Sequence, residues 1–295
     1  MAAPRVRLQV GVIGTGRVGS VLGAALGRAG HHVVAASAVS QQSRRRAERM
    51  LPGVPIRPPD EVANAADFVL LAVPDAELGP LVAGLAATDI WRPGQILAHT
   101  SGAHGVSVLA PATTLGVIGL ALHPAMTFAG RPEDLDRLTG AVFGVTADEQ
   151  LRPVAEALVV EIGGEPVWVP ESARPLYHAA LSIGSNHLVT LINDALELLD
   201  HAGVERPAEL LAPLVSASLD NVLRLGDAAL TGPVSRGDVA TVAAHVAVLR
   251  ERAPAQLAAY VAMARRTAER ARNSGRLSAT SYAAVIDALE AAWRS

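Results

Sequence analysis

The chain has 295 residues, enough for two domains of ordinary size, with 25 basic and 28 acidic residues and a formal net charge of −3. This charge balance excludes the basic footprint of a nucleic-acid-binding protein, and a hydrophobic content of 50% excludes a disordered chain. Every basic residue is arginine, which excludes a lysine nucleophile, and the absence of cysteine excludes thiolate nucleophiles and disulfides. The nine histidines lack metal-ligand spacing, so no metal site is expected.

At the start of the chain, residues 1–7 lack the apolar core and cleavage site of a signal peptide. No uninterrupted apolar run further along approaches the length of a membrane span. We therefore expect a soluble, cytoplasmic protein without membrane or nucleic-acid partners.

The first half of the chain alternates short apolar runs with helix-like stretches, and near-continuous apolar runs are typical of strands buried in a parallel sheet. This alternation predicts a doubly wound α/β domain over residues 1–170. The expected strands are 8–13, 32–36, 68–73, 95–99, 117–122, 141–146 and 166–169, and the expected helices are 18–28, 43–50 and 76–86.

After Pro170 the sequence becomes rich in Ala and Leu at helical spacing, punctuated by Gly and Pro. We expect a second, all-helical domain over residues 171–295. Its predicted helices are 175–202, 208–230, 239–251, 255–273 and 280–294.

The glycine motif Gly14-Thr15-Gly16-Arg17-Val18-Gly19 stands after the first expected strand and opens a helix. In such a G-x-G-x-x-G loop the first glycine permits a tight turn, the second lets a pyrophosphate approach, and the third packs helix against strand. Free N–H groups and the helix dipole favour the anion. The motif predicts dinucleotide binding; the alternative is a purely structural turn.

The end of the second strand, where NAD enzymes usually carry an acidic residue for the ribose, holds none here. Ser37 and Ser40 stand there, and Arg44 follows with two further arginines. Hydroxyls and a guanidinium suit a 2′-phosphate, so the sequence favours NADP(H). The alternative is that the arginines form a solvated helix face.

Polar residues follow three further strands. Val73 and Pro74 lie at the carboxyl edge where open sheets bind ligands, although a turn explains them equally well. In the loop 99–105, Ser101 is a candidate for a substrate carboxylate, against the alternative of a helix-capping polar loop. His123 is placed to exchange a proton in a reduction, or is a buried structural histidine.

In the first helix of the second domain, His178, Ser182 and Asn186 are spaced at i, i+4 and i+8. This spacing places them along one broad helix face, where polar groups must meet water, each other or a ligand. We expect that face to border the nicotinamide.

These motifs, in this order, resemble the bacterial Rossmann-like oxidoreductases that carry a DUF2520 domain, over nearly the whole chain. A more distant resemblance is to the 6-phosphogluconate dehydrogenase-like superfamily, with its β-hydroxyacid dehydrogenases, ketopantoate reductases, pyrroline-5-carboxylate reductases and prephenate dehydrogenases. The resemblance implies an N-terminal Rossmann domain, a helical C-terminal domain and, as is often found in this family, a homodimer formed through those helices. Some such proteins are thought to act as NADPH-dependent ketopantoate reductases.

One departure concerns the proton donor. Related dehydrogenases carry Lys-x-x-x-Asn on the first helix of the second domain, and aligning Asn186 with that asparagine puts Ser182 in place of the lysine. Serine is a poor proton donor, so His123 or His178 takes that role, and the His-Pro of prephenate dehydrogenases favours His123. A second departure is that relatives often have arginine near Val39.

We therefore expect an NADPH-dependent reductase of a small carboxylate-bearing carbonyl compound, ketopantoate being one candidate. His123, or alternatively His178, would donate the proton, Ser182 and Asn186 would orient the oxygen, and Ser101 would contact the carboxylate. The competing hypotheses are a non-catalytic NADP(H)-binding sensor and an imine reductase of the pyrroline-5-carboxylate type.

Overall fold

The computed structural model describes residues 7–294, which divide into two compact units at Ser185 and Asn186. Residues 1–6, part of the segment in which no signal peptide is expected, lie outside the described residues. No helix within 7–294 is long and apolar enough to cross a membrane.

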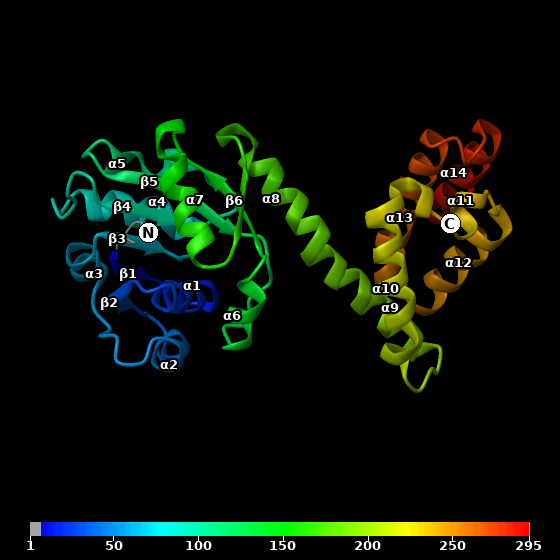
Figure 1. The fold of residues 1–295 in the computed structure, drawn as a ribbon. Helices are drawn as coiled ribbons and strands as arrows, with labels where there is room; N and C mark the ends of the chain where they lie inside the picture. The colour runs from blue at the N-terminus through cyan, green and yellow to red at the C-terminus, as the bar shows by residue number, and fades with distance from the viewer. Residues whose placement is uncertain (1–6, 295) are drawn as a thin grey trace. The chain divides into compact units, whose positions relative to one another are not determined.

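The first unit is built on one seven-stranded sheet in the order β2-β1-β3-β4-β5-β6-β7 (Figure 1). Its strands are β1 (Gln9–Ile13), β2 (His32–Ser37), β3 (Phe68–Leu71), β4 (Ile96–His99), β5 (Ile118–Pro124), β6 (Val142–Thr146) and β7 (Glu165–Trp168). The strands from β2 to β5 pair in parallel, and β1 pairs with both β2 and β3. Strands are therefore added in opposite directions on the two sides of the β1–β3 pair. The carboxyl ends of β1 and β3 border the crevice where open α/β sheets bind ligands.

The expected parallel sheet is confirmed with one exception, because β6 runs antiparallel to β5. The segment after Pro124 leads into β6 at the same end of the sheet, so the two strands are joined as in a wide hairpin. The amide of Ala125 donates to the carbonyl of Val142 at 2.8 Å. A parallel return would need a crossover along the full length of the strand. β7 then pairs in parallel with β6.

Helices cover both faces of the sheet because side chains of successive strand residues point to opposite sides. One face packs against α1, α2, α6 and α7, and the other against α3, α4, η1 and α5. The helical segments are α1 (Arg17–Arg28), α2 (Gln41–Met50), α3 (Pro59–Ala65), α4 (Asp75–Ala86), η1 (Val106–Leu109), α5 (Ala110–Thr113), α6 (Glu133–Leu138), η2 (Glu149–Leu151), α7 (Arg152–Glu161) and η3 (Glu171–Ala173). Sequence patterns predicted α1, α2 and α4 but not the others.

The predicted helix 175–202 is not α-helical throughout. It consists of α8 (Arg174–Ser182), a π-helical turn η4 (Ile183–His187) and α9 (Leu188–His201). The division between the two units falls inside this turn, later than the expected boundary after residue 170, because α8 is anchored to the sheet by the buried side chain of Arg174.

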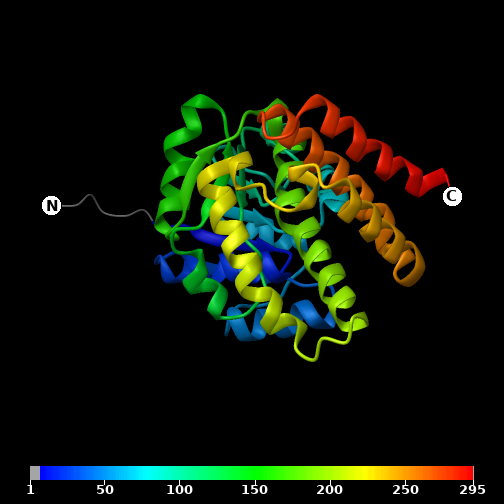
Figure 2. The same ribbon diagram turned by 90° about the vertical axis from the view of Figure 1, so that its right-hand side faces the viewer.

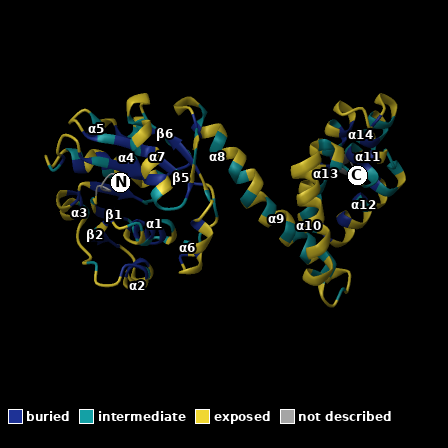
Figure 3. Cartoon of the chain, viewed as in Figure 1, coloured by how far each residue is buried: buried dark blue, intermediate teal, exposed yellow. Residues whose placement is uncertain are grey.

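The second unit is all-helical. After α9 come α10 (Pro207–Leu225), η5 (Gly226–Ala229), α11 (Pro233–Arg236), α12 (Val239–Arg252), α13 (Pro254–Asn273) and α14 (Ala279–Arg294). The last four pack side by side around their own apolar core, which includes Val242, Val261 and Leu289 (Figure 2). By contrast, α9 and α10 contain no buried residue (Figure 3).

Candidate functional site

The glycine loop joins β1 to α1 at the crevice between β1 and β3. Gly14 has a φ of +95°, which only glycine adopts without strain, and a Cβ there would lie 2.5 Å from the carbonyl oxygen of Ala72. A Cβ on Gly19 would clash with the carbonyl of Gly14. Both glycines therefore serve the close packing of this loop, the helix and the end of β3, as the sequence predicts.

Gly16 is different from the other two glycines of the motif. A Cβ placed on it would meet no atom within 4 Å, so its backbone borders open space. It also caps the N-terminus of α1, whose first turn carries no acidic residue. Arg17 is exposed and Val18 half-buried on that first turn. Free N–H groups beside an open backbone are the features that a pyrophosphate requires.

Thr15 and Ser37 hold this loop from behind. Thr15 is fully buried, and its hydroxyl lies 3.2 Å from the carbonyl oxygens of Ser37 and Ser43. The buried hydroxyl of Ser37 accepts a hydrogen bond from the amide of Gly14 at 3.2 Å. Both predicted cofactor residues therefore lie at the loop, with their side chains engaged in fixing its shape.

Ser40 and Arg44 stand at the start of α2, next in the chain after Ser37. The exposed Ser40 caps α2 by accepting from the amide of Ser43 at 3.1 Å, and the first turn of α2 has no acidic residue. Arg44 is exposed one turn further on. Val39, near which the family resemblance leads us to expect arginine, is 96% exposed, and its apolar side chain supplies no charge for a phosphate. A second helix N-terminus, a hydroxyl and an exposed guanidinium form a suitable site for a phosphate.

Val73 and Pro74 complete this cradle from the β3 side. Val73 Cγ1 would lie 3.1 Å from a Cβ on Gly14, so the residues that follow β1 and β3 lie close together. Pro74 is exposed and precedes the first residue of α4. Together these residues fit the diphosphate of a dinucleotide, with a basic, carboxylate-free environment at the end of β2.

Further along the same sheet edge, His99 at the end of β4 has a structural role. It is fully buried, its Nε2 donates to the carbonyl of Gly105 at 2.8 Å, and its Nδ1 accepts from the amide of Ser101 at 3.2 Å. Burial lowers its pKa to about 4, so the ring is neutral and holds the loop 99–105 in shape.

Ser101 is almost completely buried in that loop. Its hydroxyl oxygen accepts a hydrogen bond from the amide of His104 at 3.1 Å, which closes a local turn. Its hydroxyl proton is left for another acceptor. The turn supports the polar-loop interpretation, while the donor remains compatible with a substrate carboxylate.

His123, in β5, pairs with Tyr177 of α8. Its Nδ1 lies 2.9 Å from the Tyr177 hydroxyl, and the two rings meet edge to face with centroids 5.6 Å apart. Burial, followed by the charge of Arg174 and the proximity of His178, lowers the pKa of His123 to about 4. The imidazole is therefore neutral near pH 7 and acts there as a hydrogen-bond donor, not as an imidazolium acid.

His178 faces His123 across Gly102, with ring centroids 6.2 Å apart. A Cβ on Gly102 would lie 3.0 Å from Nε2 of His123 and 2.9 Å from Cδ2 of His178. The structure thus brings His123, His178 and the Ser101 loop together, which the sequence predicts only as separate candidates.

Arg174 anchors this cluster. It is 1% exposed; its Nε donates to Thr146 Oγ1 at 2.8 Å, and its Nη2 donates to the carbonyls of Ala121 and Gly144 at 3.1 and 3.0 Å. Its Nη1 donates to the carbonyl of Ser101 at 3.4 Å. Among the described residues it has no ion pair with a carboxylate, and burial lowers its pKa.

The other two predicted residues of this helix are not held by the cluster. Ser182 is half-buried in α8, with no side-chain hydrogen bond within the described part of the chain. Asn186 is exposed in the π-helical turn at the start of the second unit, where its carbonyl accepts from Thr190. The expected i, i+8 face is therefore interrupted, because a π turn changes the register of the residues that follow it.

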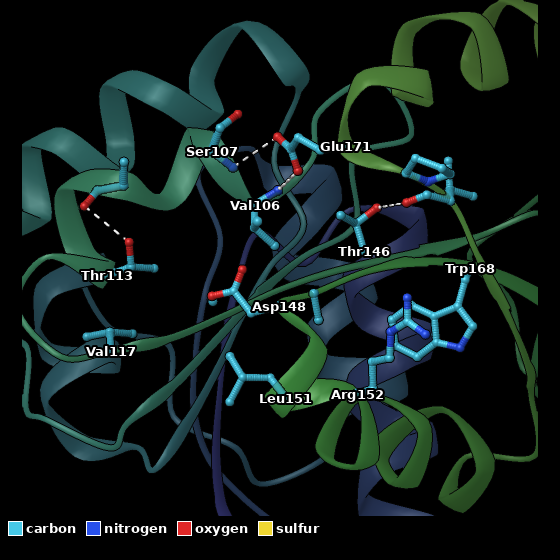
Figure 4. A pocket seen from close by; sticks show the side chains of 15 residues that line it. Val106, Ser107, Thr113, Val117, Thr146, Asp148, Leu151, Arg152, Trp168 and Glu171 are labelled. Carbon is cyan, nitrogen blue, oxygen red and sulfur yellow. Dashed lines mark hydrogen bonds between the residues drawn. The ribbon is translucent and has the colours of Figure 1, made fainter.

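A cavity of about 720 Å³ lies elsewhere on the first unit (Figure 4). In it the Glu171 carboxylate accepts from the amides of Val106 and Ser107, and the Arg152 guanidinium lies 4.6 Å from the centre of the Trp168 ring. It contains none of the predicted site residues, and it meets their cluster through Thr146, which binds Arg174, and through Glu171, which lies beside Gly105.

The sequence alone gives neither Arg174 nor Tyr177 a role in the site. A signal for Arg174 was present, because it precedes Tyr177 and His178 by one helical turn and so shares their face. A cation at a helix N-terminus also opposes the helix dipole, which indicates a specific partner.

Comparison with known proteins agrees with this architecture. Residues 2–124 match the model of the Rossmann-like domain, and residues 141–267 match that of a domain of unknown function, DUF2520. The chain therefore combines a Rossmann-like domain with a DUF2520 domain, which confirms the resemblance seen in the sequence. No curated protein matches the chain.

Several solved structures share the fold. A protein of Bacteroides fragilis assigned as an NADP oxidoreductase is 21% identical, with 89% of this chain and 98% of that chain covered and a TM-score of 0.76. An imine reductase from Pseudomonas sp. is 19% identical, with 98% and 100% covered and a TM-score of 0.66. A pyrroline carboxylate reductase of Plasmodium falciparum, solved with NADP bound, is 12% identical, with 94% and 98% covered and a TM-score of 0.57.

Proposed function

We propose that this protein is an NADP(H)-dependent oxidoreductase that reduces the carbonyl group of a small, carboxylate-bearing compound. The observation that carries the proposal is the position of two groups in the sheet. The glycine cradle follows β1, and His123 lies near the carboxyl end of β5, a strand of the same parallel set. The carboxyl ends of parallel strands lie at the same sheet edge, so cofactor and proton donor are available to one substrate.

The cofactor side is supported by the chemistry of the cradle. Gly14, Gly16 and Gly19 would admit the pyrophosphate at the N-terminus of α1. Ser40 and Arg44 would hold the 2′-phosphate, which a carboxylate at this place would repel. When bound, the dihydronicotinamide supplies a hydride.

The substrate side rests on the loop 99–105 and α8. Ser101 would bind the substrate carboxylate, and His123 would hydrogen-bond the carbonyl oxygen through Nε2. His178 would flank that oxygen, with Ser182 and Asn186 as further polar groups of the same helical segment. 2-Dehydropantoate (ketopantoate) is the first compound to test.

Two alternatives use the same cradle. An imine reductase is favoured by the names of two structural neighbours, the imine reductase and the pyrroline carboxylate reductase. A non-catalytic NADP(H) sensor is favoured by Ser182, which stands where related dehydrogenases have lysine.

The test is NADPH oxidation, followed by absorbance, against 2-dehydropantoate, other 2-oxo acids and pyrroline-5-carboxylate, with NADH in parallel. Turnover of a 2-oxo acid with NADPH is the expected result. Tight NADPH binding without turnover of any compound would favour the sensor. Replacing His123 by Ala should lower kcat by about 10²-fold or more with little change in NADPH affinity, and an unchanged kcat would contradict the assignment.

The proposal includes a homodimer formed through α9 and α10. Neither helix has a buried residue, and both expose large apolar side chains, among them Leu191, Leu214 and Val222. A second copy of the chain would remove these side chains from water. We also place the protein in the cytoplasm, where NADPH-dependent reductions draw on the cofactor pool.

A further inference from the structure

We infer that Tyr177 supplies a proton to His123 when His123 gives its own proton to the substrate. The site is thereby suited to protonating a carbonyl oxygen and not to binding an iminium cation. This inference rests on the proposed function and concerns residues of the first unit alone.

The first step is the assignment of the ring proton of His123. The Tyr177 hydroxyl lies 2.9 Å from His123 Nδ1, and its oxygen also accepts a hydrogen bond from the backbone of Gly144. Burial raises the pKa of Tyr177, so the hydroxyl keeps its proton near pH 7. It therefore donates to Nδ1, and the proton of the neutral imidazole lies on Nε2.

The second step is the direction of Nε2. Nε2 of His123 would lie 3.0 Å from a Cβ on Gly102. Any side chain at position 102 would therefore cover this nitrogen, and glycine leaves it accessible. Gly102 belongs to the loop that carries Ser101, the candidate for the substrate carboxylate. A carbonyl oxygen beside that carboxylate is thus within the region that Nε2–H faces.

The third step is the charge around the pair. The Arg174 guanidinium carbon lies 5.7 Å from the centre of the Tyr177 ring, and its charge partly opposes the rise in the Tyr177 pKa. The pKa of His123 is lowered by the charges of Arg174, His178 and His99 and raised by that of Asp75. The buried cation favours negative charge that develops on an oxygen and disfavours a positively charged iminium.

During reduction, a proton passes from His123 to the substrate oxygen, and Tyr177 supplies a proton to His123. The substrate oxygen becomes negative when the carbonyl carbon accepts the hydride, and it takes the proton from Nε2 of His123. His123 takes the Tyr177 hydroxyl proton at Nδ1 and stays neutral, as the other tautomer. Nε2 then takes a proton from water, leaving hydroxide in the solvent, and Nδ1 returns its proton to the tyrosinate beside Arg174, so that the ring is again in its first tautomer. Tyr177 acts through His123 and is therefore a positioning and relay residue.

The test uses the full-length chain and two matched variants, Tyr177→Phe and Tyr260→Phe. Tyr260 is the control because it makes the same contact in the second unit, with its hydroxyl 2.9 Å from Nδ1 of His245 and ring centroids 5.9 Å apart. Nitrogen-15 NMR of the histidines, recorded without cofactor, reports which ring nitrogen carries the proton.

We expect His123 to be protonated on Nε2 in the wild-type protein and to become a mixture of tautomers in Tyr177→Phe, but not in Tyr260→Phe. A proton on Nδ1 in the wild type overturns the relay, whatever the activity. In turnover, Tyr177→Phe should lower kcat about 10- to 100-fold, with KM changed by less than about threefold. Wild-type kcat in that variant also overturns it.

The substrate class is tested with the same protein. We expect kcat/KM for a 2-oxo acid to exceed that for pyrroline-5-carboxylate by at least about tenfold, and the reverse preference overturns the inference. If the wild-type protein binds NADPH but reduces no compound, the proposed function has failed. The NMR result then decides by itself whether Tyr177 donates to His123.

Discussion

The hydroxyl of Ser37 accepts a hydrogen bond from the amide of Gly14, with 3.2 Å between the two atoms. This bond ties the end of β2 to the first glycine of the cofactor loop. An acidic residue at the end of β2 would instead bind a ribose hydroxyl, as in NAD enzymes. Here the strand end is neutral and serves the loop, and phosphate recognition is left to the N-terminus of α2.

Ser40→Asp tests this arrangement. Aspartate caps a helix as well as serine does, so the free energy of unfolding should change by less than about 0.5 kcal/mol. Its charge should repel a 2′-phosphate and weaken NADPH binding by about tenfold or more, with NADH binding changed far less. Fluorescence titration of both cofactors measures this. Equal weakening of both would show that Ser40 does not contact the 2′-phosphate.

Arg44→Gln is the companion variant at the same helix end. It removes a free, exposed guanidinium without altering the cap, so NADPH binding should weaken and become less sensitive to salt. The exposed Arg45→Gln is the control, and NADPH affinity should respond to position 44 and not to 45. If NADPH affinity fell in Arg45→Gln and not in Arg44→Gln, the phosphate contact would belong to Arg45.

Gly16→Ala and Gly19→Ala separate binding from folding. Gly16 has a φ of −66° and open space where a Cβ would stand, so the alanine variant should fold normally and lose dinucleotide affinity. Gly19→Ala should be destabilised by roughly 1–3 kcal/mol, because its Cβ meets the Gly14 carbonyl. Thermal unfolding and NADPH titration of both variants distinguish the two effects. A Gly16→Ala variant that binds NADPH normally would contradict the proposed cradle.

The sequence was sufficient to predict the sheet, its glycine loop and the candidate histidines, since these depend on local patterns. It was insufficient where a long-range contact decides the structure. The direction of β6 depends on how Ala125 meets Val142, which no local pattern encodes. The short helices α3 and α5 are hidden because few residues give no reliable periodicity.

The same limit applies to the site. His123 was identifiable as a strand-end histidine, but its neutral state depends on burial and on Arg174, which follows it by many residues. The π-helical turn likewise gives no local sequence signal, so the register of Asn186 relative to His178 could not be derived from the spacing.

Arg174→Met tests the anchor of α8. The variant leaves the carbonyls of Ala121 and Gly144 without their guanidinium donor, and the free energy of unfolding should fall by about 2–4 kcal/mol. Arg276→Met is the matched control, because Arg276 also donates to two carbonyls, those of Ala228 and Leu230, but is exposed. Its loss should be at most about 1 kcal/mol. Denaturant unfolding of both compares them, and equal losses would refute the anchoring role.

Leu214→Glu tests the apolar face of α10, on which Leu214 is 62% exposed. If two copies meet there, the buried charge should shift the molecular mass measured by light scattering from dimer to monomer. The exposed Glu209→Gln, on the same helix, is the control and should leave the mass unchanged. A wild-type protein that is monomeric at all concentrations tested would rule out the proposed dimer.

The stability of the first unit should fall as the solution becomes acidic, and His99 and His123, each with a pKa lowered to about 4, both contribute. The pKa of His99 is about 4 in the folded protein and 6.5 in the reference state, so between these values the unfolded chain binds a proton that the folded chain does not. The free energy of unfolding is therefore unaffected above about pH 6.5 and declines from there to about pH 4, by roughly 3 kcal/mol for this group.

His99→Asn provides the check on this assignment. Asparagine can still accept from the Ser101 amide but loses the bond to Gly105, so the variant should be less stable than wild type at pH 7. It should also lose less stability between pH 6.5 and 4, because its side chain does not titrate. Denaturant unfolding across this range measures both slopes. Parallel slopes for wild type and variant would show that another group governs the acid sensitivity.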